Sequence, residues 1–319
     1  MLRCTILGIF LATTAAQAND SVAQLGAGGL VLVRANAVTM QSEDLYISPS
    51  QVRVNYEFRN NDKDAKSYLV AFPMPIINPD SYLDSDVSVP KQEQDNFLDF
   101  KVTVEGKEIA PQLEMRALSG GLDVTDELKA LNIPLNPLAD KTRGFIAKMP
   151  RDKLSALVKK GAVVTDESNA FPAWSLKSTY FWYQDFPGNA IVHVGHVYAP
   201  AVGGAFYSSV PELEKRNRET YCVDGTTYKA IDAKLKNATQ EQPYLSEKTL
   251  QYILTTGANW SGAIENFRLV IDKEKPDAVV SFCMDGVAKI SPTQFEVKKK
   301  DFIPDRELDI LILSEMPKN

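Results

Sequence analysis

Short segments in which apolar and polar residues alternate are the feature of this sequence that most restricts its fold. Residues 52–59 (VRVNYEFR) alternate strictly, and residues 267–271 follow the same period. A period of two buries one face of a strand and leaves the other in water, which is typical of antiparallel sheets. Glu105 and Gly106, which follow another alternating run, indicate a tight hairpin. The sequence therefore predicts an α+β fold, mainly β, of antiparallel β-sandwich (immunoglobulin-like) elements with helical insertions.

Strand and helix patterns also divide the chain. Residues 178–186 and 190–198 are β segments joined through a Pro-Gly-Asn turn, which predicts a hairpin. Apolar residues at helical spacing predict helices in five places, at 125–131, 151–160, 211–218, 228–235 and from about residue 247. Thr125 is expected to cap the first of these helices.

These patterns predict four regions along the chain. We expect a signal peptide at 1–18, an N-terminal β-sandwich region at 19–118, a helical insertion or linker at 119–168 and a C-terminal α+β region at 169–319. The stretch at 119–168 is too short to bury a core of its own, so we expect it to pack on the sandwich.

The first 18 residues have the layout of a secretory signal. A basic Arg3 precedes an apolar stretch at 4–12, and Ala16, Gln17 and Ala18 form an A-x-A cleavage site before Asn19. The apolar stretch is shorter than the roughly 20 residues that a transmembrane helix needs. We therefore predict cleavage between Ala18 and Asn19 and a soluble, periplasmic or secreted mature chain without a transmembrane segment.

Cysteine content fits that location. Cys4 lies within the predicted leader, which leaves Cys222 and Cys283 as an even pair. Neither lies in a C-x-x-C motif or beside a histidine, so a reactive thiol or a metal ligand is the less favoured alternative. A disulfide between Cys222 and Cys283 is the favoured interpretation for an exported chain.

Charge and glycine patterns argue against nucleic acid and nucleotide cofactors. The formal net charge is −6, and the only basic run, residues 298–300, is typical of a solvated strand edge. The glycines at 26–29 lack a third spaced glycine and a following Lys-Ser/Thr, so neither a dinucleotide fold nor a P-loop is indicated. We interpret 26–29 as a flexible lead into the first strand and predict no cofactor and no nucleic-acid partner.

Histidines and carboxylates offer few catalytic candidates. His193 and His196 lie three apart, so on a strand they face opposite ways, which disfavours a metal site. His196 shares a face with Tyr198 and is the candidate for acid or base catalysis. Glu43 and Asp44 are expected to lie in a solvated turn. The sequence contains no G-x-S-x-G motif.

An aromatic cluster is the candidate for ligand binding. Tyr180 and Trp182 fall on one face of the strand, and Phe181 and Tyr183 fall on the other. If the Tyr180 face were exposed, its rings, together with Tyr198, could stack on sugar or on a peptide. The alternative, which we favour, is that these rings belong to the core.

Several longer motifs resemble a known family. LGAGGLV at 25–31, VAFPMP at 70–75, YFWYQDFP at 180–187 and VSFC at 280–283 resemble the bacterial family defined by domain of unknown function 4424. The resemblance covers nearly the whole mature chain. It implies an exported, full-length module, favours a Cys222–Cys283 pair and treats His196 as part of the module's pattern, without giving it a role.

Three functions remain open from the sequence. The first is a non-catalytic periplasmic or secreted protein that binds a protein or a cell-envelope component. The alternatives are an envelope-directed hydrolase that uses His196 and a nearby carboxylate, and a carbohydrate-binding module that uses the Trp182 face. Of these functions we favour the non-catalytic one over an enzyme.

Overall fold

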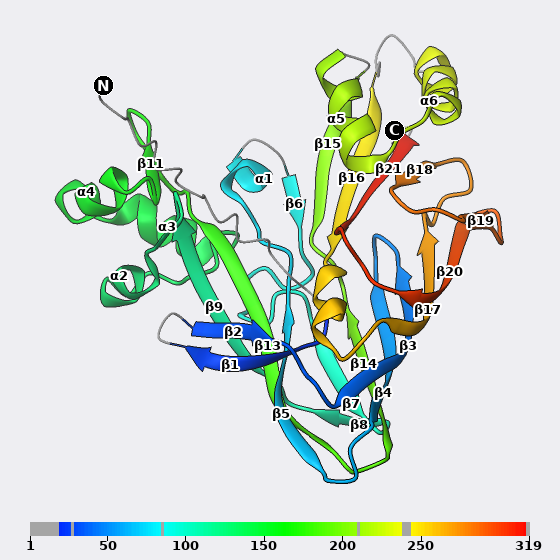
Figure 1. Ribbon diagram of the computed structural model, residues 1–319. Helices are drawn as coiled ribbons and strands as arrows, with labels where there is room; N and C mark the ends of the chain where they lie inside the picture. The colour runs from blue at the N-terminus through cyan, green and yellow to red at the C-terminus, as the bar shows by residue number, and fades with distance from the viewer. Residues whose placement is uncertain (1–18, 27–28, 84–85, 209–210, 238–243, 317–319) are drawn as a thin grey trace, which may run out of the picture.

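The computed structural model describes residues 19–26, 29–83, 86–208, 211–237 and 244–316. Two arms diverge from a shared β base, which gives the molecule the outline of a V (Figure 1). One arm carries α2 (Thr125–Ala130), α3 (Asp140–Lys148) and α4 (Arg151–Lys159), and the other carries α5 (Pro211–Tyr221) and α6 (Gly225–Asn237). The predicted signal peptide, residues 1–18, lies outside the described residues. No helix in the described ranges is long and apolar enough to cross a membrane.

The strands of the described residues form three sheets and one short ribbon. The first sheet has the order β10 (Leu122–Asp123), β9 (Gln112–Ser119), β13 (Ser175–Phe186), β5 (Lys66–Pro73), β1 (Ser21–Gly26) and β2 (Gly29–Val33). The second has the order β19 (Ala288–Lys289), β20 (Gln294–Phe302), β17 (Ile264–Asp272), β3 (Val38–Ile47), β4 (Val52–Asn60), β14 (Ile191–Tyr198), β7 (Lys101–Val104) and β8 (Lys107–Ile109). The third has the order β18 (Val279–Phe282), β21 (Leu308–Glu315), β16 (Leu245–Tyr252), β15 (Val202–Tyr207) and β6 (Asp86–Ser88), and the ribbon pairs β11 (Val163–Thr165) with β12 (Ala170–Pro172).

The helices are short and lie mainly in the arms. They are α1 (Pro79–Leu83), α2 (Thr125–Ala130), α3 (Asp140–Lys148), α4 (Arg151–Lys159), α5 (Pro211–Tyr221), α6 (Gly225–Asn237) and the 3-10 helix η1 (Thr255–Asn259). Every strand pairing among the described residues is antiparallel except that of β3 with β17. The predicted mainly-β, antiparallel fold class is confirmed.

The first two sheets face each other and enclose the main core. On β4 the predicted alternation holds, since Val54, Tyr56 and Phe58 are buried while Arg53 and Asn55 are exposed. Rings from the two sheets meet in the space between them, as when Phe58 of β4 contacts Phe186 of β13 with ring centroids 6.0 Å apart. Both sheets combine strands from the two ends of the chain: β13 lies between β9 and β5 in the first sheet, and β14 lies between β4 and β7 in the second.

The prediction that residues 178–186 and 190–198 form a hairpin is wrong, because β13 and β14 do not pair with each other. β13 pairs with β5 and β9 in the first sheet, whereas β14 pairs with β4 and β7 in the second. The Pro-Gly-Asn turn reverses the chain but carries it across to the other sheet. The turn from β4 to β5 crosses in the same way, and the two turns are hydrogen-bonded: Asn60 N–H donates to Ala190 O at 3.0 Å, and Asn189 N–H donates to Asp62 O at 2.9 Å.

Three local expectations are also wrong. The segment from residue 247 is strand β16, because pairing with β15 and β21 on both sides overrides a pattern that fits either period. Thr125 is the first residue of α2, preceded by Val124, and its hydroxyl accepts from Ala117 N–H instead of capping the helix. Gly26 ends β1 and pairs with Gly29 of β2, so these two glycines follow the first strand and do not lead into it.

The predicted disulfide is present. Cys222 follows α5, Cys283 follows β18, and their sulfur atoms are bonded. The bridge borders a second, smaller core that packs α5 and α6 on the third sheet and includes Tyr207, Ile231 and Leu313. The bond therefore fixes the helices of the second arm to its sheet.

Replacing Gly188 by alanine is expected to lower the free energy of unfolding by about 1–3 kcal/mol, because one turn must move away from the other. A Cβ at Gly188 would lie 1.9 Å from the carbonyl oxygen of Lys63. Gly144→Ala in α3 is the control, since a Cβ there meets nothing within 4 Å. Denaturant unfolding measures both variants, and equal midpoints for wild type and Gly188→Ala would contradict the tight contact.

Removing the disulfide by Cys222→Ser with Cys283→Ser is expected to reduce the free energy of unfolding. The bond closes a loop with a sequence separation of 61, for which the chain-entropy model gives about 4 kcal/mol. Denaturant unfolding of the double variant measures this loss. A thiol reagent should find no free cysteine in the native mature chain, and two reactive thiols would overturn the pairing.

Candidate functional site

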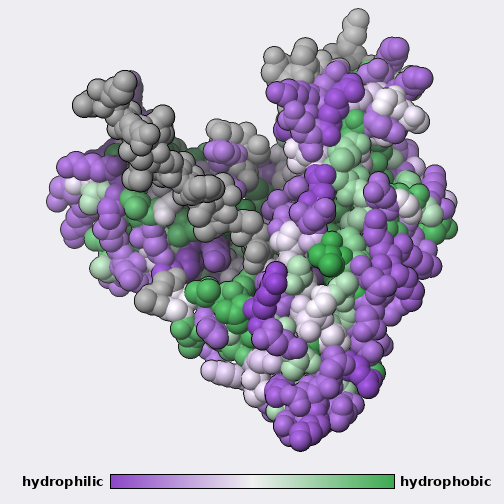
Figure 2. Space-filling model, viewed as in Figure 1, coloured by the Kyte–Doolittle hydropathy of each residue, from purple (hydrophilic) through white to green (hydrophobic). Residues whose placement is uncertain are grey.

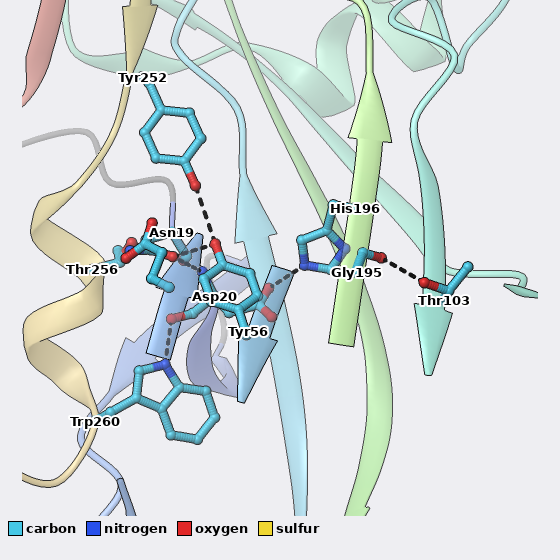
Figure 3. A network of polar contacts seen from close by, with 10 residues as sticks. Asn19, Asp20, Tyr56, Thr103, Gly195, His196, Tyr252, Thr256 and Trp260 are labelled. Atoms are coloured by element: carbon cyan, nitrogen blue, oxygen red, sulfur yellow. Dashed lines mark hydrogen bonds and ion pairs between the residues drawn. The ribbon is translucent and has the colours of Figure 1, made fainter. Parts of the chain in front are cut away.

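A buried polar network lies between the two facing sheets (Figure 3). It begins at Asn19 and Asp20, which precede β1 and are both fully buried. Asn19 accepts through its carbonyl oxygen from the Thr256 hydroxyl at 2.7 Å, and Asp20 accepts through its carbonyl oxygen from Trp260 Nε1 at 2.6 Å. Residues at the start of the described chain are thus held by the region of η1, far along the sequence.

Tyrosine hydroxyls and a glutamate complete one side of the network. The Tyr56 hydroxyl donates to Asn19 Oδ1 and lies 3.1 Å from the Tyr252 hydroxyl. Asn19 Nδ2 donates to Glu43 Oε2 at 3.0 Å. Burial raises the pKa of Glu43 to about 8; the hydrogen bond from Asn19 opposes this rise and the charge of Asp20 adds to it.

Glu43 is not in a solvated turn, so that expectation is wrong. It lies within β3, two residues before buried Leu45, and is 1% exposed. Only Asp44 faces outward, where it pairs with Arg268 at 2.8 Å. Every second residue of a strand points to the same side, which places Glu43 in the interior. There the side-chain amide of Asn19 gives the carboxyl group a hydrogen-bond donor.

His196 lies on the other side of the network, on β14. Its Nε2 is 3.0 Å from Asp20 Oδ1, and neither side chain has any solvent exposure. Burial raises the pKa of Asp20, while the charge of His196 and its hydrogen bond lower it. The rings of Phe72 and Trp182 lie 4.8 and 5.4 Å from the imidazole. A His–Asp pair of this kind can hold a proton, but the sheets seal it from substrate.

His193 faces away from His196, as the spacing predicts. It is exposed on β14, where its Nδ1 lies 3.3 Å from the Glu105 carboxylate and its Nε2 lies 3.9 Å from Glu57. Within the described ranges no three His, Cys, Asp or Glu side chains are grouped closely enough to hold a metal ion.

The candidate aromatic face points into the core. Tyr180 and Trp182 are 2% and 5% exposed, and the Tyr180 hydroxyl donates to Asn96 Oδ1 at 2.6 Å. Tyr183, on the opposite face of β13, is the exposed ring of the cluster. The Trp182 face is therefore part of the sandwich interior. Its role in binding stays a prediction, and these rings have almost no exposed surface on which a ligand could stack.

A cleft of about 260 Å³ opens on the inner side of the second arm. Its walls come from the loop after β5 and from β6, β15, β16 and β21, which meet near the place where the arms diverge (Figure 1). The surface is hollowed between the two arms, and hydrophilic residues cover the outer edges (Figure 2). Tyr198, one of the sequence candidates, lines the cleft although it is 4% exposed.

Apolar and polar groups divide the lining. Ile76, Val87 and Leu98 contribute apolar surface. Gln251 and Asp309 contribute a polar edge, where Gln251 Nε2 donates to Asp309 Oδ1 at 2.9 Å. Burial raises the pKa of Asp309, whereas the hydrogen bond from Gln251 lowers it.

Sequence reasoning missed most of these residues. Tyr56 and Glu43 occupy inward positions of alternating strands, and that register was a signal that both side chains are buried. Asn19 and Asp20 carried no such signal, because they precede the first strand. Gln251 and Asp309 meet only through the pairing of β16 with β21, which the sequence does not specify.

Tyr56→Phe is expected to lower the free energy of unfolding by about 1–3 kcal/mol, since Asn19 would lose a buried donor. Tyr183→Phe is the matched control, because Tyr183 is 71% exposed and its change should stay within about 0.5 kcal/mol. Chemical denaturation measures both variants. Equal midpoints for the two would show that the network contributes little to stability.

Comparison with known proteins places the chain in a family. A crystal structure of a protein from Legionella pneumophila, provisionally called a nutrient binding protein, aligns over 93% of this chain and 70% of that one, with a TM-score of 0.48 and 16% sequence identity. This likeness is too low to carry a conclusion. No curated protein sequence matches the chain. The model of domain of unknown function DUF4424 matches residues 18–311, so the chain belongs to the DUF4424 family, as its motifs predicted.

Proposed function

We propose that the protein is an exported, non-catalytic binding protein whose ligand occupies the cleft beside Tyr198. The observation that carries this proposal is the contrast between two places. The acid–base pair of His196 and Asp20 is sealed between the sheets, whereas the cleft is open and carries apolar walls with a few polar groups. Such a combination is typical of sites that bind small molecules or chain ends.

Export is supported by two independent features. The predicted leader ends at Ala18 with a cleavage motif. The disulfide between Cys222 and Cys283 belongs to proteins of oxidising compartments. A periplasmic or secreted location is thus the one in which both features are useful.

The lining restricts the ligand. Ile76, Val87 and Leu98 favour an apolar body, and the volume limits the bound part to a small molecule or the tip of a larger partner. The amide of Gln251 and the carboxylate of Asp309 favour a hydrogen-bonding group at one end. A cell-envelope component or a protein segment with this division of polarity fits the cleft.

A hydrolase that uses His196 is less favoured. Substrate would reach the imidazole only if the two sheets separated, because the side chains of His196 and Asp20 have no solvent exposure. A carbohydrate module that uses Trp182 faces the same obstacle, since that ring is also buried.

Filling the cleft tests the binding proposal. Gln251→Trp should weaken ligand binding at least about 10-fold, because a bulky ring at the polar edge occupies ligand space. Gln112→Trp is the matched control, since Gln112 is exposed on β9 and away from the cleft. Native mass spectrometry of the mature chain mixed with fractionated envelope extract identifies the ligand, and calorimetry measures both variants.

The same experiment separates binding from catalysis. The ligand should be recovered chemically unchanged after incubation with the protein. Conversion of the ligand that is lost in His196→Ala would instead support the hydrolase. Equal affinity of the Gln251→Trp and Gln112→Trp variants would show that the ligand does not bind in the cleft.

A further inference from the structure

Asn19, which the predicted cleavage would make the first residue of the chain, is buried inside the protein. It directly follows the predicted cleavage site, and no part of it reaches solvent. Terminal residues are usually exposed and poorly ordered. Here the side chain and the carbonyl group are all hydrogen-bonded, to Glu43, Tyr56 and Thr256.

The surroundings leave space for this residue in particular. A Cβ at Gly257 would lie 2.8 Å from Asn19 Nδ2, so the absence of a side chain at that position of η1 admits the Asn19 amide. The carbonyl oxygen of Asn19 is held from the neighbouring residue, Thr256. η1 therefore forms one wall of a pocket that fits Asn19.

The pocket contains more acidic than basic groups. Two carboxyl groups, Asp20 and Glu43, are completely buried there, and one imidazole, His196, faces them. The other titratable groups that face Glu43 are the hydroxyls of Tyr56 and Tyr252. Among the described residues, Glu43 Oε1 and Asp20 Oδ2 have no hydrogen-bond partner. A buried ionised carboxylate without a partner is costly, so both carboxyl groups could ionise only with one further cation beside His196.

We propose that the missing cation is the α-ammonium group of Asn19, which cleavage after Ala18 creates and which pairs with the buried carboxylate of Glu43. In that step water adds across the amide bond. The hydroxyl goes to the Ala18 carbonyl carbon, and the Asn19 nitrogen takes a proton and leaves as an amine, which binds a further proton near neutral pH because its ordinary pKa is about 8.

Covalent geometry limits how far the nitrogen can lie from Glu43. It is bonded to the Cα whose side chain contacts Glu43 Oε2, so covalent geometry keeps it within about 5 Å of that amide. Before cleavage the same nitrogen is a neutral amide with one hydrogen. After cleavage it supplies a charge and three hydrogens in a region that contains two unpartnered carboxylate oxygens. Processing thus completes the folded structure.

Two forms of the chain test this inference. One begins at Asn19, and the other carries a short extension that ends in Ala18. The form that begins at Asn19 should melt about 5 °C or more higher. Glu43→Gln should lower the Tm of that form, yet leave the extended form unchanged or raise its Tm, because there it replaces a buried carboxyl that has no partner cation by a neutral amide.

Glu265→Gln is the matched control, since Glu265 is exposed on β17, the strand beside β3. It should act equally in both forms. An equal effect of Glu43→Gln in the two forms would overturn the pairing. So would N-terminal sequencing that places the start of the exported protein at a residue other than Asn19.

The pH dependence of stability gives a second readout. In the extended form, the pKa of Glu43 is raised by burial from 4.5 to about 8. The folded state therefore binds a proton that the unfolded state has lost, and stability falls as pH rises from 4.5 to 8. In the form that begins at Asn19, the ammonium group stabilises the carboxylate, so this fall should be absent. A parallel fall in both forms would contradict the inference.

Chemical labelling tests the wild-type chain without any variant. An amine-acylating reagent should modify the α-amine of the folded form that begins at Asn19 at least about 10-fold more slowly than that of the denatured chain. Exposed lysine side chains, such as Lys101, should react at once in both states and serve as the internal control. Rapid labelling of the α-amine in the folded protein would show that it lies in solvent.

Discussion

The hydrogen-bonded network around Asn19 and Asp20 is the constraint on which the rest of the structure depends. It joins the segment before β1, which leads into the first sheet, to β3, β4 and β14 of the second sheet, to β16 of the third sheet and to η1. Buried polar groups are tolerated only with partners, and each partner here comes from a different strand or loop. A shift in the register of any of these strands would separate a donor from its acceptor. The network therefore specifies the alignment that hydrophobic packing alone leaves open.

Much of the fold could be predicted where the information is local. The alternation on β4, the Glu105–Gly106 turn between β7 and β8, and the cysteine pair all follow from short-range patterns or from the cysteine count. Partner choice could not be predicted in this way. The turn at Gly188 signals a reversal whether the next strand pairs with the last one or crosses to the other sheet, and the crossing depends on contacts with Lys63. Segment 247–252 fits either period, and its neighbours decide for strand.

The candidate sites differ in the same respect. His196 could be singled out because histidines are rare in this chain, but its burial depends on the ring of Phe72 in the facing sheet. In the sequence, Glu43 resembles an ordinary surface carboxylate, and only its position on an inward-facing site of β3 shows that it is buried. The cleft joins Tyr198, Gln251 and Asp309, which no local pattern connects. Interior position and long-range pairing, rather than residue type, separate the two kinds of site.

The parallel pairing of β3 with β17 has a consequence for when the chain can fold. Leu45 lies opposite Leu269, and the Thr256 hydroxyl bonds to Asn19 across a sequence separation of 237. A nascent chain that has not yet been synthesised beyond β16 lacks β17 and Thr256. It can therefore complete neither the second sheet nor the hydrogen bond that holds Asn19. Long-range closure of this kind is slow and leaves the partial chain open. The second sheet and the hydrogen-bonded network around Asn19 are therefore among the last parts of the fold that can be completed.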